Sequence, residues 1–406
     1  MIKVLKRLSQ IGFKLPIYCL AFPTVLAIRL VRPFLLVRIG NMVSQRIGHL
    51  AANNELYMCE LDAGINVPSK RHLDLFFMGE PVSNHQLATM WRRVLKILPT
   101  WVLYPIHRVN RLLPGGEIHD IGHNTSWERD VHNLFDRFPA HLEFLPEELL
   151  RGESGLRAIG IPKGAPFVCL AVRDSAYLEE HMPNVNWNYH SYRDTDVQDY
   201  ALAAEELATR GYFVIRMGAR VRKPLKSSHP MVIDYAFNGM RSDFLDIYLC
   251  AKCAFCVSMG TGIETVPYIF RRPLAIVNSV PLGILLTFRD EFVHISRRHF
   301  SIKLNRELSL KEIVDLPVFL FGKTADYESA GIQLINNSPE EIRDVVVEMS
   351  ERLNGTWQPQ SEDEVLQRKF WKIFPSNKPL GNRQLHGSIR SHYGAKFLRS
   401  NRWWLE

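Results

Sequence analysis

Short apolar runs alternate with polar, capped segments through the C-terminal half of the chain. Residues 167–172 and 212–217 are nearly continuous apolar stretches, which are typical of parallel strands buried on both faces. Thr195–Gln198 has the pattern of a capping box, and it predicts a helix over 196–209 that ends at Gly211. Strands that alternate with helices indicate βαβ units and a doubly wound α/β sheet.

Further elements follow from the same signals. Ser242 predicts a capped helix over 243–251, and two more capping boxes begin at Ser309 and Ser338. The N-terminal half has a weaker pattern, from which we expect a smaller α/β domain. Its predicted strands are 72–78 and 101–105, and its predicted helices are 83–97 and 128–137.

The stretch 254–278 carries the clearest candidate chemistry. It predicts a buried strand (254–258), a glycine loop (259–262), a short helix (263–270) and a second buried strand (274–278). The first N–H groups of a helix lack internal partners and lie at its positive end, so such a loop can hold a phosphate. Glu264 can accept hydrogen bonds from ribose or sugar hydroxyls. An ordinary strand–helix turn is the alternative. The loop residues proposed to face the ligand are Ser258, Gly260, Thr261, Gly262 and Glu264.

Composition adds limits to this interpretation. The 406 residues are 46% hydrophobic and 23% charged, which is an ordinary globular balance and favours two or three domains. The formal charge of +8 favours acidic partners. The basic residues are scattered and no nucleic-acid-binding motif accompanies them, so we expect no nucleic-acid partner. Glycines and prolines over 152–166 indicate a linker between domains.

The first 39 residues combine basic and apolar side chains. The apolar run 15–28 is broken by Pro16 and Pro23 and followed by Arg29, so it is short for a membrane span. We expect a segment that lies on an anionic membrane surface, which makes the protein peripheral on the inner face of the cytoplasmic membrane. The alternative is a helix packed on the protein itself.

The six cysteines lie in apolar strings, which predicts buried, reduced thiols and a cytoplasmic location. Cys250, Cys253 and Cys256 form a C-x-x-C-x-x-C run. A metal site there would need a fourth ligand and a loop around the ion, so core packing is the better interpretation.

Several short motifs occur in order over residues 40–290. They are 46–60, 167–174, 188–193, 214–218, 233–236, 241–246 and 258–267. On these motifs the chain resembles an uncharacterised bacterial family of GT-B glycosyltransferases from surface-polysaccharide gene clusters. One position departs from the family: Ala171 stands where its relatives have a histidine, in the sequence before Arg173.

The resemblance implies a GT-B fold, in which two Rossmann-like domains face a cleft. The composition divides the chain into a membrane-surface segment (1–39), two α/β domains (40–155 and 156–356) and a tail (357–406). The resemblance implies that the first domain binds the acceptor and the second the nucleotide-sugar donor. It also implies a nucleotide-sugar as co-substrate, with no metal and no other cofactor. Helix N-termini and basic side chains would then balance the charge of the leaving diphosphate.

Candidate site residues fall where the predicted strands end, as ligands of such sheets do. Asp174 or His49 would act as the catalytic base; the respective alternatives are an Arg173–Asp174 pair that caps the strand end and a structural histidine. The donor-binding candidates outside the glycine loop are Arg173, Arg216, Gly218, Ser242, Asp243 and Asn278. Ser242 and Asp243 are explained equally by a helix cap. The acceptor-binding candidates are Gly48, Asn53 and Glu55, with Gly48 and His49 expected in a glycine turn.

Three functions are therefore compatible with the sequence. The first is a metal-independent glycosyltransferase that moves a sugar from a nucleotide-sugar to a surface-glycan or lipid-linked acceptor. The second is a nucleotide-sugar 2-epimerase, which would need no acceptor. The third is a non-catalytic scaffold of a polysaccharide-assembly complex, for which the loss of a histidine at Ala171 is the argument.

Overall fold

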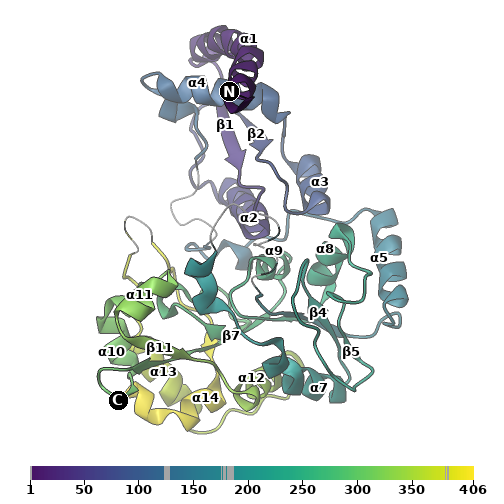
Figure 1. Ribbon diagram of the computed structural model, residues 1–406, viewed down its shortest axis with the longest axis vertical. Coiled ribbons are helices and arrows are strands. Elements are labelled where there is room, and N and C mark those ends of the chain that lie inside the picture. Colours follow the sequence, from purple (N-terminus) through teal and green to yellow (C-terminus); the bar gives the residue numbers. More distant parts are fainter. Residues whose placement is uncertain are drawn as a thin grey trace. The chain divides into compact units, whose positions relative to one another are not determined.

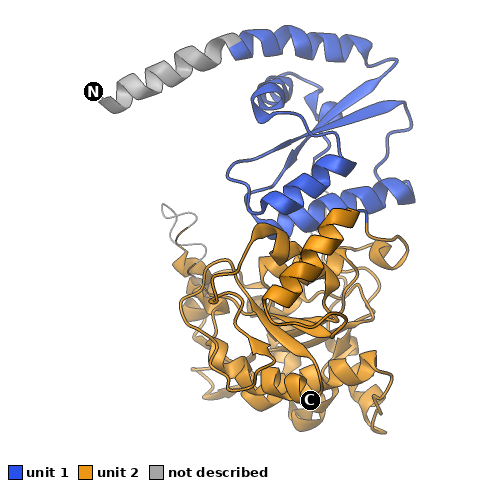
Figure 2. Cartoon of the chain, turned by 90° about the vertical axis from the view of Figure 1, so that its right-hand side faces the viewer, with its two compact units in different colours: residues 1–128, 141–143 blue, residues 129–140, 144–406 orange. Residues whose placement is uncertain are grey.

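The computed structural model describes residues 2–122, 129–174, 176, 180, 187–379, 381 and 384–406, with side chains from residue 17 onward. The chain forms a mixed α/β structure with a large parallel sheet and flanking helices (Figure 1). It divides into two compact units (Figure 2). Unit 1 contains residues 1–128 and 141–143, and unit 2 contains residues 129–140 and 144–406. Residues 144–155 therefore belong to unit 2, rather than to the N-terminal domain expected to end at 155.

Unit 1 is built on a βαβ element of parallel strands. Strand β1 (Leu36–Met42) pairs with β2 (His72–Met78), and α2 (Ile47–Ala63) connects them. Single bridges join Asp120 to β1 and Ile97 to β2. The order is therefore Ile97, β2, β1, Asp120, which matches the strand order of half a Rossmann sheet. The two outer positions are single bridges instead of full strands. The remaining helices are α1 (Ile2–Val31), α3 (His85–Val94), α4 (Thr100–Leu112) and the 3-10 turn Gly116–His119.

Two predictions in unit 1 are wrong. Residues 101–105 form part of helix α4 rather than a strand. Pro105 misleads here because it lacks the N–H that a helix interior needs, yet the helix continues through it since Leu103 and Ile106 pack into the core of unit 1. Strand β1 begins at Leu36, inside the range assigned to a membrane-surface segment.

Unit 2 contains a seven-stranded sheet in the order β12-β8-β7-β6-β3-β4-β5, with every pairing parallel. Its strands are β3 (Phe167–Ala171), β4 (Phe213–Met217), β5 (Val232–Ile233), β6 (Cys256–Ser258), β7 (Leu274–Ser279), β8 (Phe292–Ser296) and β12 (His392–Tyr393). The predicted strands 167–172, 212–217, 254–258 and 274–278 are thus confirmed as β3, β4, β6 and β7.

The helices of unit 2 cover this sheet. They are α5 (Pro146–Ala158), α7 (Ala201–Thr209), α8 (Asp243–Lys252), α9 (Thr265–Ile269), α10 (Leu310–Asp315), α11 (Thr324–Ser329), α12 (Pro339–Leu353), α13 (Asp363–Ile373) and α14 (Ala395–Ser400). A small antiparallel sheet has the order β10 (Arg306–Glu307), β9 (Arg298–Ser301), β11 (Ile332–Ile335). The tail is part of unit 2, because β12 adds to the edge of β8 and Trp404 enters the core.

The predicted caps are mostly confirmed. The hydroxyls of Ser242, Ser309 and Ser338 accept hydrogen bonds from backbone N–H groups in the first turns of their helices. At 196–209 the cap is Asp196, whose carboxylate accepts from the N–H of Gln198, rather than Thr195. The predicted helix over 128–137 is reduced to a 3-10 turn, Leu134–Asp136, among the described residues.

The cysteines are all free, and each except Cys19 is buried. The exposure of Cys19 on α1 contradicts the expectation that all six thiols are buried. Cys250, Cys253 and Cys256 pack in the interior of unit 2, as the core interpretation predicted. Among the described helices, none has both the length and the apolar character that a membrane crossing requires.

Candidate functional site

The large sheet has a topological switch point between β3 and β6. The chain adds β4 and β5 on one side of β3, and β6, β7 and β8 on the other. Loops that leave the carboxyl ends of β3 and β6 therefore diverge, and in open α/β sheets this is where ligands bind. Arg173 and Asp174 follow β3, and the glycine loop follows β6. The sequence thus placed its candidate site at the switch point of the observed sheet.

The glycine loop is closed by its own glutamate. The Oε2 atom of Glu264 accepts hydrogen bonds from Ser258 Oγ (2.5 Å), Gly260 N (2.9 Å) and Thr261 N (3.1 Å). These are N–H groups that the sequence analysis offered to a phosphate. The following Gly262–Glu264 turn is 3-10, and α9 has only five residues. The prediction that this loop binds phosphate at a helix N-terminus therefore does not fit the observed geometry.

Glu264 is a buried carboxylate with a structural task. Burial raises the pKa of Glu264, while hydrogen bonds from Ser258 and the loop N–H groups and the charge of Arg193 oppose the rise. Its hydrogen bonds hold the loop in one shape. The carbonyl of Gly260, on the same loop, accepts a hydrogen bond from Arg193 Nη2. The loop thereby positions a guanidinium group at the switch point.

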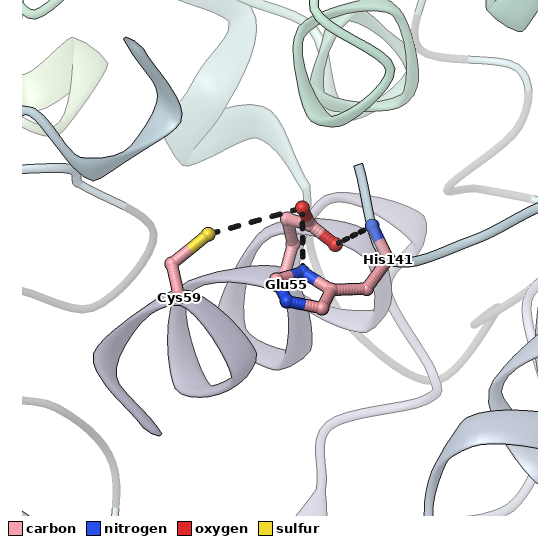
Figure 3. Close-up of side chains that lie close together, drawn as sticks. All are labelled: Glu55, Cys59 and His141. Carbon is pink, nitrogen blue, oxygen red and sulfur yellow. Dashed lines mark hydrogen bonds and ion pairs between the residues drawn. The ribbon is translucent and has the colours of Figure 1, made fainter. Parts of the chain in front are cut away.

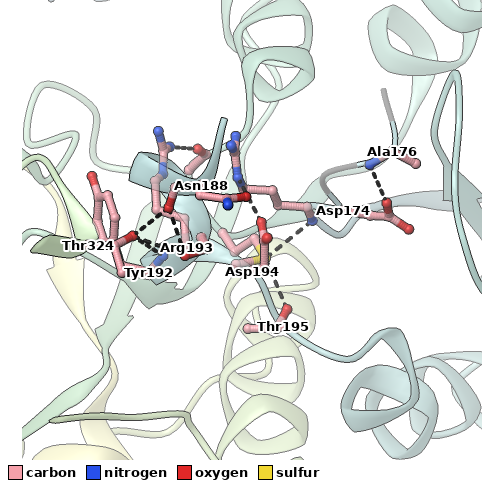
Figure 4. A network of polar contacts seen from close by, with 12 residues as sticks. Asp174, Ala176, Asn188, Tyr192, Arg193, Asp194, Thr195 and Thr324 are labelled. Atoms are coloured by element: carbon pink, nitrogen blue, oxygen red, sulfur yellow. Dashed lines mark hydrogen bonds and ion pairs between the residues drawn. The ribbon is translucent and has the colours of Figure 1, made fainter. Parts of the chain in front are cut away.

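Three arginines converge around this loop. Arg193 lies on the 3-10 turn Asn188–Arg193, Arg173 follows β3, and Arg297 follows β8. The Nε atom of Arg173 donates to Asp194 Oδ1 at 3.2 Å (Figure 4). The Nη2 atom of Arg297 donates to the Asp194 carbonyl at 2.9 Å. Burial lowers the pKa of Arg173 and of Arg297, and the charge of Arg193 adds to this effect. The cluster is a partly desolvated cationic site suited to a phosphate or diphosphate.

Asp194 is the carboxylate of this arginine cluster. Its side chain is about one-third exposed. Burial raises the pKa of Asp194 although Arg173 opposes the rise. Arg193, Asp194 and Arg297 were not predicted from the sequence as site residues. The signals were present: Arg193 ends the motif 188–193, and Arg297 follows the apolar run of β8.

Asp174 serves as a cap in this structure. Its Oδ1 atom accepts from Ala176 N at 2.7 Å (Figure 4). Its Oδ2 atom accepts from Arg222 N at 2.6 Å. Two backbone N–H groups therefore occupy the carboxylate that was proposed as a base. The alternative, an Arg173–Asp174 pair that caps the strand end, is also not observed, because Arg173 pairs with Asp194.

Two other donor-site candidates are buried inside unit 2. Arg216 is 1% exposed and bonds Asp234 and the carbonyl of Lys223. Asn278 is fully buried, and its side chain donates to Tyr200 Oη and accepts from the backbone N–H of Asn337. Because neither presents a side chain to solvent, both stabilise the fold rather than face a ligand. The sequence could not show this, since strand ends are exposed in some folds and covered in others.

The remaining donor-site candidates outside the glycine loop are a glycine in close contact with a neighbouring side chain and two residues at the start of a helix. A Cβ atom on Gly218 would lie 2.6 Å from a methyl group of Val221, which explains the glycine by packing. Ser242 Oγ accepts from Leu245 N, and Asp243 Oδ1 pairs with Arg241 at 2.9 Å. Arg241 also pairs with Asp246. These contacts describe a capped start of α8.

The acceptor-side candidates lie together on α2 of unit 1. Gly48 and His49 are in its first turn, rather than in the expected glycine turn. Asn53 lines a cavity of about 220 Å³ with Arg38 and Tyr57. Both polar atoms of its side chain are buried and have no hydrogen-bond partner among the residues that the structure describes. Glu55 is fully buried, so it does not line this cavity's surface.

A carboxylate organises the wall of that cavity. Arg38 on β1 donates from Nε to Asp74 Oδ1 on β2 at 2.8 Å, and Tyr57 Oη donates to Asp74 Oδ2 at 2.6 Å. Burial and Asp74 raise the pKa of Tyr57 far above its usual value, so its hydroxyl stays protonated. The cavity therefore combines fixed charged groups with an unsatisfied amide, and it can accept a polar ligand.

Comparisons with known proteins give the following picture. No family model matches the sequence. No curated protein sequence matches it either. Among solved structures, it is similar to a glycosyl transferase family 9 protein from Veillonella parvula, with 9% identity, a TM-score of 0.39, and coverage of 65% of this chain and 86% of that one. It is also similar to E. coli ADP-heptose LPS heptosyltransferase II, with 11% identity, a TM-score of 0.41, and coverage of 78% and 100%.

A third solved structure is the dodecameric iron-containing heptosyltransferase TibC in complex with ADP-D-beta-D-heptose. Its identity to this chain is 11% and its TM-score is 0.35, with coverage of 78% of this chain and 77% of that one. These scores describe a distant overall similarity.

Proposed function

We propose that the protein is a glycosyltransferase that moves a sugar from a nucleotide-sugar donor to a glycan or lipid-linked acceptor. One observation carries the proposal: Arg173 and Arg193 meet at the switch point of a doubly wound sheet, and the buried Arg297 adds a positive charge behind them. A nucleotide-sugar has a diphosphate that develops negative charge as the glycosidic bond breaks. Guanidinium groups fixed beforehand in a partly desolvated site stabilise such charge well.

In this proposal the arginines balance the leaving diphosphate, so transfer needs no metal ion. Asp194 orients Arg173 through the 3.2 Å hydrogen bond, and the closed glycine loop orients Arg193. On the acceptor side, the cavity beside Asn53 accepts a hydroxyl-rich ligand because its amide can both donate and accept. His49, in the first turn of α2, is retained as the proposed base.

The proposed place of the protein is the inner face of the cytoplasmic membrane. Helix α1 packs Ala21 and Val25 into the core of unit 1, yet Leu26 and Leu30 on its other side are exposed. The exposed apolar side of such a helix is stabilised when it contacts a second apolar partner, and a lipid surface is such a partner. The exposed Arg32 can meet anionic head groups. The buried free thiols support a reducing compartment.

Nucleotide binding tests the function directly. Thermal shift with UDP, GDP, ADP, dTDP and CMP should show a selective stabilisation of the wild type, since a ligand of the folded state raises the melting temperature. Arg193→Ala should weaken that binding roughly 10- to 100-fold, because a charge-assisted hydrogen bond contributes about 1.5–3 kcal/mol. Arg306→Ala removes an exposed arginine of unit 2 and should leave binding unchanged.

Product analysis then separates the alternatives. The proposal requires sugar transfer from the selected donor to a hydroxyl acceptor. Formation of an epimeric nucleotide-sugar without any acceptor would identify a 2-epimerase instead. Absence of binding by every nucleotide would favour the scaffold.

A further inference from the structure

Helix α2 presents three potential ligand groups on one face. Glu55, Cys59 and Asp62 are spaced at i, i+4 and i+7, so their side chains lie one above another. His141 approaches this face from the short segment 141–143, which belongs to unit 1 although unit 2 residues flank it in the sequence. Neither the charge pattern nor the family motifs indicated that His141 would meet α2.

The ligand atoms of three of these residues are close together. Glu55 Oε1 lies 3.1 Å from His141 Nδ1 and 3.9 Å from Cys59 Sγ (Figure 3). All three atoms lie within 4.8 Å of one another, and among the described residues this is the one group of such side chains that does so. Ligands of a tetrahedral zinc ion, with bonds of about 2.0–2.3 Å, are separated by roughly 3.3–3.8 Å. Only small side-chain shifts would therefore place all three around one ion.

A second carboxylate orients the histidine. Asp62 Oδ2 lies 2.9 Å from His141 Nε2, on the opposite edge of the ring from Glu55. When Nε2 donates its proton to Asp62, the lone pair of Nδ1 faces Glu55 and Cys59. A carboxylate in this position is the usual outer partner of a metal-bound histidine, because it fixes the tautomer and raises the basicity of the ligand.

The charges also balance around a divalent ion. Glu55 and Cys59 are fully buried, and the side chain of His141 is 12% exposed. A carboxylate, a thiolate and a neutral imidazole together neutralise an M²⁺ ion, so the buried group carries no net charge. Without a metal, the same residues form an ion pair in which protonated His141 bridges Glu55 and Asp62. The thiol of Cys59 has no role in that ion pair, whereas zinc and similar metal ions prefer a thiolate ligand.

We propose that Glu55, Cys59 and His141 bind one divalent transition-metal ion, zinc foremost, with Asp62 as the outer carboxylate and water as the fourth ligand. The ion fastens segment 141–143 to α2 and so has a structural role in unit 1. Binding releases the thiol proton of Cys59 and any proton on His141 Nδ1 to solvent. This inference is independent of the proposed sugar transfer, which needs no metal.

The test uses the full chain, purified without a histidine tag. Elemental analysis should find about one equivalent of a first-row divalent metal, and the metal-free protein titrated with Co²⁺ should develop a thiolate-to-cobalt charge-transfer band. Cys59→Ser should abolish the band, and Asp62→Asn should weaken Co²⁺ binding roughly 10- to 100-fold. Cys19→Ser, which removes the exposed thiol of α1, should change neither result.

Other outcomes would overturn the site. A protein that carries no stoichiometric metal and develops no charge-transfer band with Co²⁺ contains only the ion pair. The same conclusion follows if the band persists in Cys59→Ser, because the thiolate would then come from elsewhere. Asp62 is half-exposed, so Asp62→Asn gives a folded variant on which the affinity change can be measured even if changes at the buried ligands unfold unit 1.

Discussion

Single residues at the switch point have separable tasks, and Gly260 shows this best. Its φ of +83° lies in the left-handed region, and a Cβ atom would lie 3.2 Å from Arg193 Nη2. The positive φ strains any L residue other than glycine by about 1–2 kcal/mol. The close approach of a Cβ atom would displace the guanidinium group of Arg193, which the loop positions.

Gly260→Ala should therefore lower both stability and nucleotide affinity. We expect the free energy of unfolding to fall by about 1–2 kcal/mol, and the affinity for the selected nucleotide to fall at least several-fold. Urea unfolding and thermal-shift titration measure the two effects. Gly164→Ala is the matched control, because Gly164 has a φ of +79° and open space around it. It should lose similar stability and keep its affinity; an equal loss of affinity in both variants would contradict the role given to Arg193.

The position of the candidate site in the fold was predictable from the sequence, but several of its residues were not. Strand ends could be located, so Arg173 and the glycine loop were placed at the switch point. Whether a polar side chain at a strand end is covered depends on segments far away in the chain. Asn337 covers Asn278, and Arg297 arrives from beyond β8. No local pattern contains this information.

At the scale of elements, the sequence was most informative for buried parallel strands and capped helices. A strand covered on both faces must be apolar throughout, and a serine before a helix has a direct hydrogen-bonding reason to be there. Helix α4 was missed because Pro105 is a strong local signal against a helix. Its tertiary packing through Leu103 and Ile106 overrides that signal.

Helix α1 provides a prediction at this scale. Leu26→Ser/Leu30→Ser removes apolar surface from its exposed side without changing its buried side. Sedimentation with anionic vesicles should show at least tenfold weaker binding than for the wild type. Transfer of one leucine side chain from water to an apolar phase contributes about 1.5–3 kcal/mol to the free energy of binding, and the serine variant lacks this contribution. Leu304→Ser/Leu353→Ser changes two exposed leucines of unit 2 and should bind like the wild type. Failure of the wild type to sediment with the vesicles would exclude the membrane surface.

At the scale of the whole molecule, unit 2 buries histidines in their neutral form. Burial lowers the pKa of His294 and His299 to about 4 and that of His386 to about 3. Below their ordinary pKa of 6.5 the unfolded chain binds protons that the folded chain does not. The stability that these neutral histidines contribute is therefore complete above pH 6.5. It is lost as the pH drops from 6.5 toward the pKa values of the folded state.

Acidification should thus destabilise unit 2, with each histidine contributing up to roughly 3–5 kcal/mol by the ordinary conversion of a pKa shift. Urea unfolding between pH 7 and pH 4.5 should show a shallower pH dependence for His386→Gln than for the wild type. His132→Gln alters an exposed histidine of the same unit and should leave the dependence unchanged. Parallel pH profiles of His386→Gln and the wild type would refute this account.

The edge strand β12 has a consequence for biosynthesis. It adds residues 392–393 to β8, and Tyr393 Oη bonds both the backbone N–H and the hydroxyl of Ser296. A ribosome completes β8 long before it reaches these residues. The nascent chain therefore carries an open sheet edge through that interval, and such an edge can pair with other chains. Translation past residue 393 pairs this edge with β12, so a message that stops earlier yields a protein inclined to aggregate rather than a shorter folded protein.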